Sequence, residues 1–135
     1  MSGILIIEDT ETVRTMLRTV LEMAGYEVAE AWNGRVGIRS FHQSPPDLVI
    51  TDIYMPECDG LEVIQELRHS SPTVRIVAMT GHSGEMDLLE VARKLGAMDV
   101  LRKPFTMETL LWTVSHSLGG EPARGAADSV GDTSI

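Results

Sequence analysis

Five short segments with strand character alternate with five longer segments of helical periodicity along most of this chain. The short segments are residues 4–7, 27–31, 48–51, 75–79 and 100–102. The longer segments repeat apolar residues mainly at three- and four-residue spacing, and they cover residues 13–24, 36–41, 61–67, 86–95 and 110–118. Alternation of this kind predicts βαβ units, and therefore an α/β fold built on a parallel sheet.

Turn-forming residues mark the ends of several predicted helices. Gly25 and Gly96 each follow the last apolar residue of a helical segment, where glycine is favoured because it readily adopts a left-handed backbone. The run Ser-Pro-Pro-Asp at 44–47 is expected to stop the second helix, and Pro72 to follow the third. Five pairs of strand and helix therefore fill residues 4–118.

The length of 135 residues is that of one domain. We expect residues 1–118 to form this domain. Residues 119–135 contain too few apolar side chains to offset the entropy lost on ordering them. The sequence therefore predicts a disordered C-terminal tail.

Charge and cysteine content exclude several classes of protein. Lys and Arg total 11 against 20 Asp and Glu, and the net charge of −9 opposes direct binding to nucleic acid. The single cysteine, Cys58, excludes an internal disulfide, and no Cys/His spacing resembles a zinc site. The apolar stretch at 4–7 is too short for a signal sequence or a membrane span, so we expect a cytoplasmic protein without membrane insertion.

Polar side chains end four of the predicted strands. Glu8 and Asp9 follow the first strand, Asp52 the third, Thr80 the fourth and Lys103 the fifth. Because the carboxyl ends of parallel strands meet at one edge of a sheet, we expect these side chains to surround a ligand site. Taken singly, Asp52 would be interpreted as a helix or turn cap, and Thr80 as an ordinary β-branched strand residue. The presence of all these polar residues at strand ends instead favours a ligand site.

The side chains at these strand ends suit phosphoryl transfer. Two unit charges 4 Å apart repel by about 4 kcal/mol at an effective dielectric of 20, so three clustered acids need a cation. Carboxylate oxygens suit Mg²⁺, and an aspartate can attack phosphorus as a nucleophile. Lys103 and Thr80 would neutralise charge on the phosphoryl oxygens, and a cis bond from Lys103 to Pro104 would aim the ammonium inward.

Five motifs lie at the predicted strand ends and in the loops after them. They are Ile-Ile-Glu-Asp at 6–9, Asp-Leu-Val-Ile-Thr-Asp-Ile-Tyr-Met-Pro at 47–56, Asp-Gly-Leu-Glu at 59–62, Met-Thr-Gly at 79–81 and Lys-Pro-Phe at 103–105. Over residues 3 to about 118 the chain thus resembles the receiver domain of two-component response regulators, in its single-domain, chemotaxis-type form. The resemblance implies a doubly wound, flavodoxin-like parallel sheet of five strands in the order 2-1-3-4-5, with helices on both faces.

The resemblance also implies a role for each residue at the strand ends. Asp52 would accept a phosphoryl group from a phosphohistidine on a sensor histidine kinase or a histidine phosphotransfer protein. The Mg²⁺ ligands would be Glu8, Asp9, Asp52 and the backbone carbonyl of Tyr54, while Thr80 and Lys103 would bind the phosphoryl oxygens. The chain would act as a self-catalysed switch rather than an enzyme, and a conformational shift would signal to a downstream protein.

Three positions bear on how such a switch would behave. Val100 stands three residues before Lys103, where members of the family carry an aromatic residue that turns inward on phosphorylation. The usual aromatic coupling is therefore not expected here. Tyr54 and His82 occupy two positions that vary in the family and tune hydrolysis of the acyl phosphate. We hypothesise that they set the lifetime of the phosphorylated state.

Other readings of the same residues remain open. A phosphatase of the haloacid dehalogenase type also uses an aspartate nucleophile at a strand end, but it needs a second acid two positions later, where this chain has Tyr54. A pseudo-receiver would bind a partner without phosphorylation. A nucleotide- or flavin-binding fold is disfavoured, because no glycine-rich phosphate loop follows Ile7.

Overall fold

The structure is a computed structural model, which describes residues 2–55, 59–81 and 88–119. Its strands are β1 (Gly3–Ile7), β2 (Glu27–Ala31), β3 (Leu48–Asp52), β4 (Ile76–Thr80) and β5 (Asp99–Arg102). Its helices are α1 (Glu11–Met23), α2 (Gly34–Gln43), α3 (Gly60–Ser70), α4 (Leu88–Leu95) and α5 (Met107–Ser117). The predicted tail beyond Gly119 and the predicted start of the fourth helix at Met86 lie outside the described residues.

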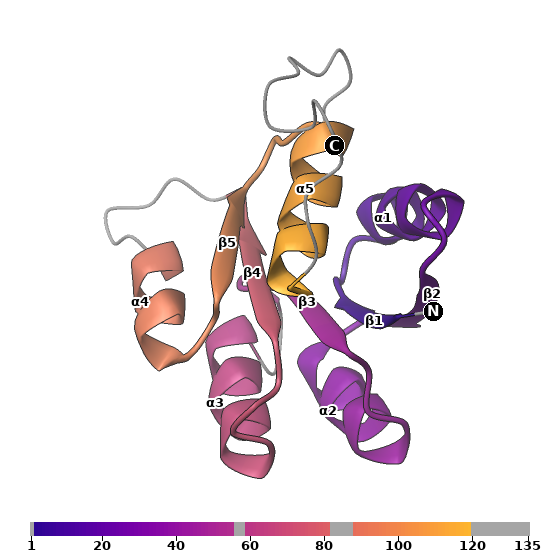
Figure 1. Ribbon diagram of the computed structural model, residues 1–135. Coiled ribbons are helices and arrows are strands. Elements are labelled where there is room, and N and C mark those ends of the chain that lie inside the picture. The colour runs from indigo at the N-terminus through magenta and orange to yellow at the C-terminus, as the bar shows by residue number, and fades with distance from the viewer. Residues whose placement is uncertain (1, 56–58, 82–87, 120–135) are drawn as a thin grey trace.

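The five strands form one parallel sheet in the order β2-β1-β3-β4-β5. The predicted fold class and strand order are therefore confirmed. Helices α1 and α5 cover one face of the sheet, and α2, α3 and α4 cover the other (Figure 1). All residues of β3 and β4 are buried, as expected for central strands with helices on both sides.

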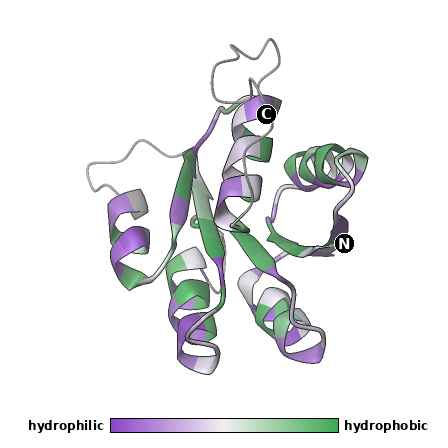
Figure 2. Cartoon of the chain, in the orientation of Figure 1, coloured by the Kyte–Doolittle hydropathy of each residue, from purple (hydrophilic) through white to green (hydrophobic). Residues whose placement is uncertain are grey.

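Alternate strand residues divide the core into two clusters. In β1, Leu5 and Ile7 face the α2, α3 and α4 side, whereas Ile4 and Ile6 face α1 and α5. This is the period of two that an extended strand imposes on its side chains. Hydrophobic residues accordingly dominate the central strands in Figure 2, and the helices carry hydrophilic residues along part of their surface. Among the residues described, no helix is both long and apolar enough to cross a membrane.

Side-chain caps determine where three of the helices begin. Asn33, Asp59 and Thr106 each accept a hydrogen bond from a backbone N–H in the first turn of α2, α3 and α5. Such caps satisfy N–H groups that have no partner within the helix. At the other end, Gly25 and Gly96 have positive φ angles beyond α1 and α4, as predicted.

Two strands extend one residue further than their apolar runs indicated. Asp52 pairs with Met79 in the sheet, and Thr80 pairs with Arg102. The backbone N–H groups of Ile53 and Lys103 continue this pattern by donating to the carbonyls of Met79 and Thr80, both at 2.9 Å. The hydrogen bonds between strands involve only the backbone, so a polar side chain does not end a strand. Asp52 and Thr80 are therefore part of the hydrogen-bonded sheet, which fixes the positions of their backbones.

Gly60 allows α3 to begin against the backbone of β3. Its N–H donates to the carbonyl of Ile53 at 2.8 Å. A Cβ atom at Gly60 would lie 2.2 Å from the carbonyl oxygen of Asp52 and 2.6 Å from the Cα of Ile53. Backbone atoms cannot move aside as a flexible side chain can, so the close approach requires glycine.

Gly60→Ala is expected to lower the free energy of unfolding by about 2–3 kcal/mol, because the added methyl group must push α3 away from Asp52. Urea unfolding followed by circular dichroism measures the change. Gly3→Ala is the matched control, since the nearest atom to its added Cβ would lie 3.9 Å away. An equal effect of the two substitutions would contradict the role given to Gly60.

Candidate functional site

Asp52 lies at the carboxyl end of β3, in the middle of the sheet. The residue is 6% exposed. Its Oδ1 accepts a hydrogen bond from the backbone N–H of Tyr54 at 3.3 Å, and its backbone carbonyl accepts one from the Thr51 hydroxyl at 3.0 Å. The carboxylate is thus held at a strand end with one oxygen, Oδ2, turned to the groups of neighbouring strands.

Glu8 follows β1 and is fully buried, and both its backbone and its side chain form hydrogen bonds. Its N–H donates to the carbonyl of Ala31 at 3.0 Å, and Oε2 accepts from the N–H of Thr10 at 3.0 Å. Its Oε1 lies 2.8 Å from Nζ of Lys103. A buried carboxylate requires such partners, because an unpaired buried charge is strongly disfavoured.

Lys103 contacts both Glu8 and Asp52 through its ammonium group. It follows β5, yet its Nζ also lies 3.5 Å from Oδ2 of Asp52. The Lys103–Pro104 peptide bond is cis, as the sequence suggested. Groups from the ends of β1, β3 and β5 therefore meet at one edge of the sheet, as predicted.

Asp9 completes a cluster of three acids. It is exposed, and Glu8, Asp9 and Asp52 each offer a carboxylate oxygen such that all three oxygens lie within 4.8 Å of one another. Hard oxygen donors at this spacing fit a small divalent cation such as Mg²⁺, which takes one or two carboxylates and keeps several waters. Asp9 is the exposed member of the cluster, whereas Glu8 and Asp52 are buried.

Burial raises the pKa of Asp52 to about 6, and the nearby charge of Glu8 adds to this effect. The Lys103 ammonium and the Tyr54 N–H act in the opposite direction, and Asp9 contributes a further smaller increase. Desolvation and like charge both disfavour the ionised carboxylate, whereas the ammonium and the hydrogen bond favour it. The site therefore holds negative charge that a bound cation would stabilise.

Comparison with known proteins identifies the family to which this fold belongs. The family model of the response regulator receiver domain matches residues 4–115. The chain belongs to this family. The predicted resemblance is confirmed, and the protein is a receiver domain of the kind found in two-component systems.

Individual relatives support this assignment. The receiver is 38% identical over 103 residues to the chemotaxis protein CheY of Thermotoga maritima, a match that covers 76% of this chain and 85% of that protein. It is 36% identical over 115 residues to the regulatory protein AtoC of Escherichia coli, covering 85% of this chain but only 25% of AtoC. A receiver domain structure from Clostridium thermocellum superposes with a TM-score of 0.83 at 32% identity, covering 88% of this chain and 95% of that one.

The remaining predicted site residues lie as follows. Thr80 is the last residue of β4 and is 4% exposed. Tyr54 lies two residues after the end of β3, with 46% of its surface exposed. Val100 lies in β5 and packs against the core cluster on the α2, α3 and α4 face. His82 lies outside the described residues.

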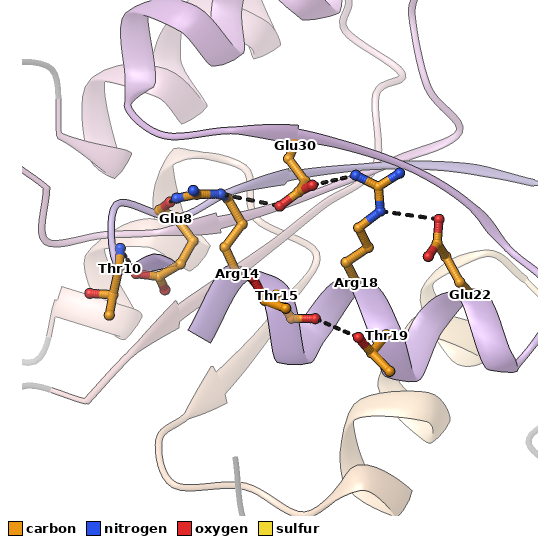
Figure 3. A network of polar contacts seen from close by, with 8 residues as sticks. All are labelled: Glu8, Thr10, Arg14, Thr15, Arg18, Thr19, Glu22 and Glu30. Atoms are coloured by element: carbon orange, nitrogen blue, oxygen red, sulfur yellow. Dashed lines mark hydrogen bonds and ion pairs between the residues drawn. The ribbon is translucent and has the colours of Figure 1, made fainter. Parts of the chain in front are cut away.

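A charged network beside the receiver's acids was not predicted. Arg14 of α1 contacts both the backbone of Glu8 and the side chain of Glu30, and Arg18 contacts Glu30 and Glu22 (Figure 3). A signal for it exists in the sequence. Arg14 precedes the buried Leu17 and Leu21 at helical spacing, so it lies on the inward face of α1, where a charge needs a partner.

The raised pKa of Asp52 predicts how the stability of the receiver depends on pH. The ordinary pKa of 3.8 applies to the unfolded chain, against about 6 in the folded protein. Between these values the unfolded chain releases a proton that the folded protein keeps, so a rise in pH favours unfolding. Without a cation, we expect this group to cost up to about 3 kcal/mol of unfolding free energy as the pH rises from about 4 to about 7.

Chemical unfolding at a series of pH values, in wild type and Asp52→Asn, measures this contribution. The difference between the two proteins isolates Asp52 from the other acids. We expect the variant to become the more stable of the two above about pH 6. Parallel curves over the whole range would show that the carboxylate is not destabilised in the folded receiver.

Proposed function

We propose that this receiver accepts a phosphoryl group on Asp52 from a phosphohistidine of a sensor histidine kinase or a histidine phosphotransfer protein. The groups that surround the Asp52 carboxylate are the main support for this proposal. An ammonium lies 3.5 Å from Oδ2, and two further acids have oxygens within 4.8 Å. A nucleophile, a cation that attracts phosphate and a set of metal ligands thus share one strand edge.

We further propose that the reaction requires Mg²⁺, held by Glu8, Asp9 and Asp52 and by the backbone carbonyl of Tyr54. The fit of the three carboxylates to a hard cation supports this assignment. Bound Mg²⁺ would supply positive charge that offsets repulsion between an anionic donor and the acids. The N–H of Tyr54 already orients Asp52 through Oδ1, which leaves Oδ2 as the attacking oxygen.

Transfer to Asp52 would proceed as an in-line displacement at phosphorus. A bond forms between Oδ2 and phosphorus while the bond from phosphorus to the histidine nitrogen breaks, and the electron pair of that bond leaves with the imidazole. The Lys103 ammonium would then move its contact from the carboxylates to a phosphoryl oxygen, and the Thr80 hydroxyl would donate to another. Water would later hydrolyse the acyl phosphate, which releases inorganic phosphate and restores the Asp52 carboxylate.

The phosphorylated receiver would signal to a downstream protein through a shift at these strand ends. The position three before Lys103 is Val100, which is partly buried and packs in the core. An aliphatic side chain there has no ring to turn inward. We therefore propose that the shift starts at Thr80 and passes to the segment that follows β4.

Exposure to acetyl phosphate and Mg²⁺, followed by intact-mass measurement and a parallel assay of released phosphate, tests the proposal. We expect one phosphoryl group per chain, and phosphate release no faster than the adduct decays. Continuous phosphate release that is faster than the decay of the adduct would favour the aspartate-based phosphatase. A chain that gains no phosphoryl group under any condition would behave as a pseudo-receiver.

A further inference from the structure

Arg14 is a charged residue on the inward face of α1, and its side chain is only 15% exposed. Its guanidinium donates hydrogen bonds to two acceptors, one just after β1 and one in β2. Nη1 donates to the backbone carbonyl of Glu8 at 2.9 Å, and Nε donates to Oε1 of Glu30 in β2 at 3.2 Å. The planar fork of arginine suits two such acceptors at once, which a lysine ammonium does not match in geometry.

The contact with Glu8 lies at the point where the chain leaves the sheet. The N–H of Glu8 still follows the ladder by donating to Ala31, but its carbonyl lies beyond the last paired residue of β1. That carbonyl belongs to the peptide group that joins Glu8 to Asp9. Arg14 therefore holds the one backbone unit shared by two acids of the cluster.

Glu30 keeps this arrangement electrically balanced. It accepts from Arg14 through Oε1 and from Arg18 through Oε2, and Arg18 also pairs with Glu22 at 3.1 Å (Figure 3). Two cations and two anions thus form a neutral network. Arg14 can therefore hold the Glu8 backbone without adding much net positive charge beside the acids of the proposed cation site.

We propose that Arg14 is a positioning residue of the metal site. By holding the peptide group between Glu8 and Asp9, it sets the direction in which both carboxylates meet the cation. The inference rests on the proposed Mg²⁺ site and adds a residue to its supporting structure. Partners that orient metal ligands are often worth about 10- to 100-fold in metal affinity.

Titration of the apo protein with Mg²⁺, followed through backbone amide shifts in NMR spectra, tests the inference. We expect Arg14→Ala to weaken Mg²⁺ binding about tenfold. Arg18→Ala is the matched control, because Arg18 lies on the same helix and shares Glu30 but makes no contact with Glu8. We expect it to change the affinity by less than about twofold.

The outcomes separate this inference from the proposed function. Equal Mg²⁺ affinities of the two variants would overturn the role of Arg14 alone, whereas a wild-type protein that binds no Mg²⁺ would overturn the metal site as well. The same spectra report whether each variant is folded. Should Arg14→Ala unfold, Arg14→Lys keeps a cation beside Glu30 but loses the fork, and unchanged affinity in that variant would also overturn the inference.

Discussion

Replacing Asp52 with asparagine is expected to abolish formation of the phosphoryl adduct from acetyl phosphate and Mg²⁺. The amide has no anionic oxygen to form an acyl phosphate, and no other acid of the cluster occupies the same position at the centre of the sheet. The variant should stay folded, because it removes a carboxylate whose ionisation the folded protein disfavours. Intact-mass measurement after a fixed exposure gives the result directly.

Asp47→Asn provides the control for this substitution. Asp47 precedes β3 at the other end of the strand, is exposed, and accepts a hydrogen bond from the N–H of Gly3 at 2.7 Å, which an asparagine oxygen can also accept. We expect this variant to gain one phosphoryl group as the wild type does. An adduct of wild-type yield on Asp52→Asn would show that another residue is the acceptor.

Lys103→Met is expected to slow adduct formation by about 10²-fold at saturating Mg²⁺. Its ammonium is a cation within 4 Å of both Glu8 and Asp52, and the proposed transfer uses it to neutralise charge on a phosphoryl oxygen. Methionine matches the unbranched apolar stem of lysine and lacks only the ammonium group. The time course of phosphorylation, followed by intact mass, measures the rate.

The chain offers a direct control, because Lys94 is its other lysine and lies exposed on α4. Lys94→Met should leave the rate unchanged. Lys103→Arg adds a second comparison, since it keeps the charge but replaces a compact ammonium with a broad planar group. We expect its rate to fall between those of wild type and Lys103→Met, and a wild-type rate for Lys103→Met would remove the ammonium from the transfer step.

Most of the fold was predictable because the sequence has clear apolar runs for the strands and a clear three- and four-residue spacing for the helices. The β-branched runs of β1, β3 and β4 are fully buried or nearly so, and such runs are typical of strands covered on both faces. The carboxyl ends of the strands were harder to predict. Asp52 and Thr80 continue the ladder because their backbones pair with Met79 and Arg102, which no property of their own side chains reveals.

The site was predictable where its residues come from strand ends, and less so elsewhere. The topology of a parallel sheet brings Glu8, Asp52 and Lys103 together whatever the details of the loops. The tether from Arg14 depends instead on how α1 lies against β2, which local periodicity does not specify. A charge on the buried side of an amphipathic helix was its only visible sign.

One measurement tests most directly whether acids from two strands create a metal-dependent acceptor. The protein is exposed to acetyl phosphate with Mg²⁺ or with EDTA, the acyl phosphate is reduced with borohydride, and the modified residue is located by peptide mapping. We expect reduction at Asp52 alone, and only in the sample that contains Mg²⁺. Modification at a different residue, or equal modification of Asp52 in EDTA, would contradict the account.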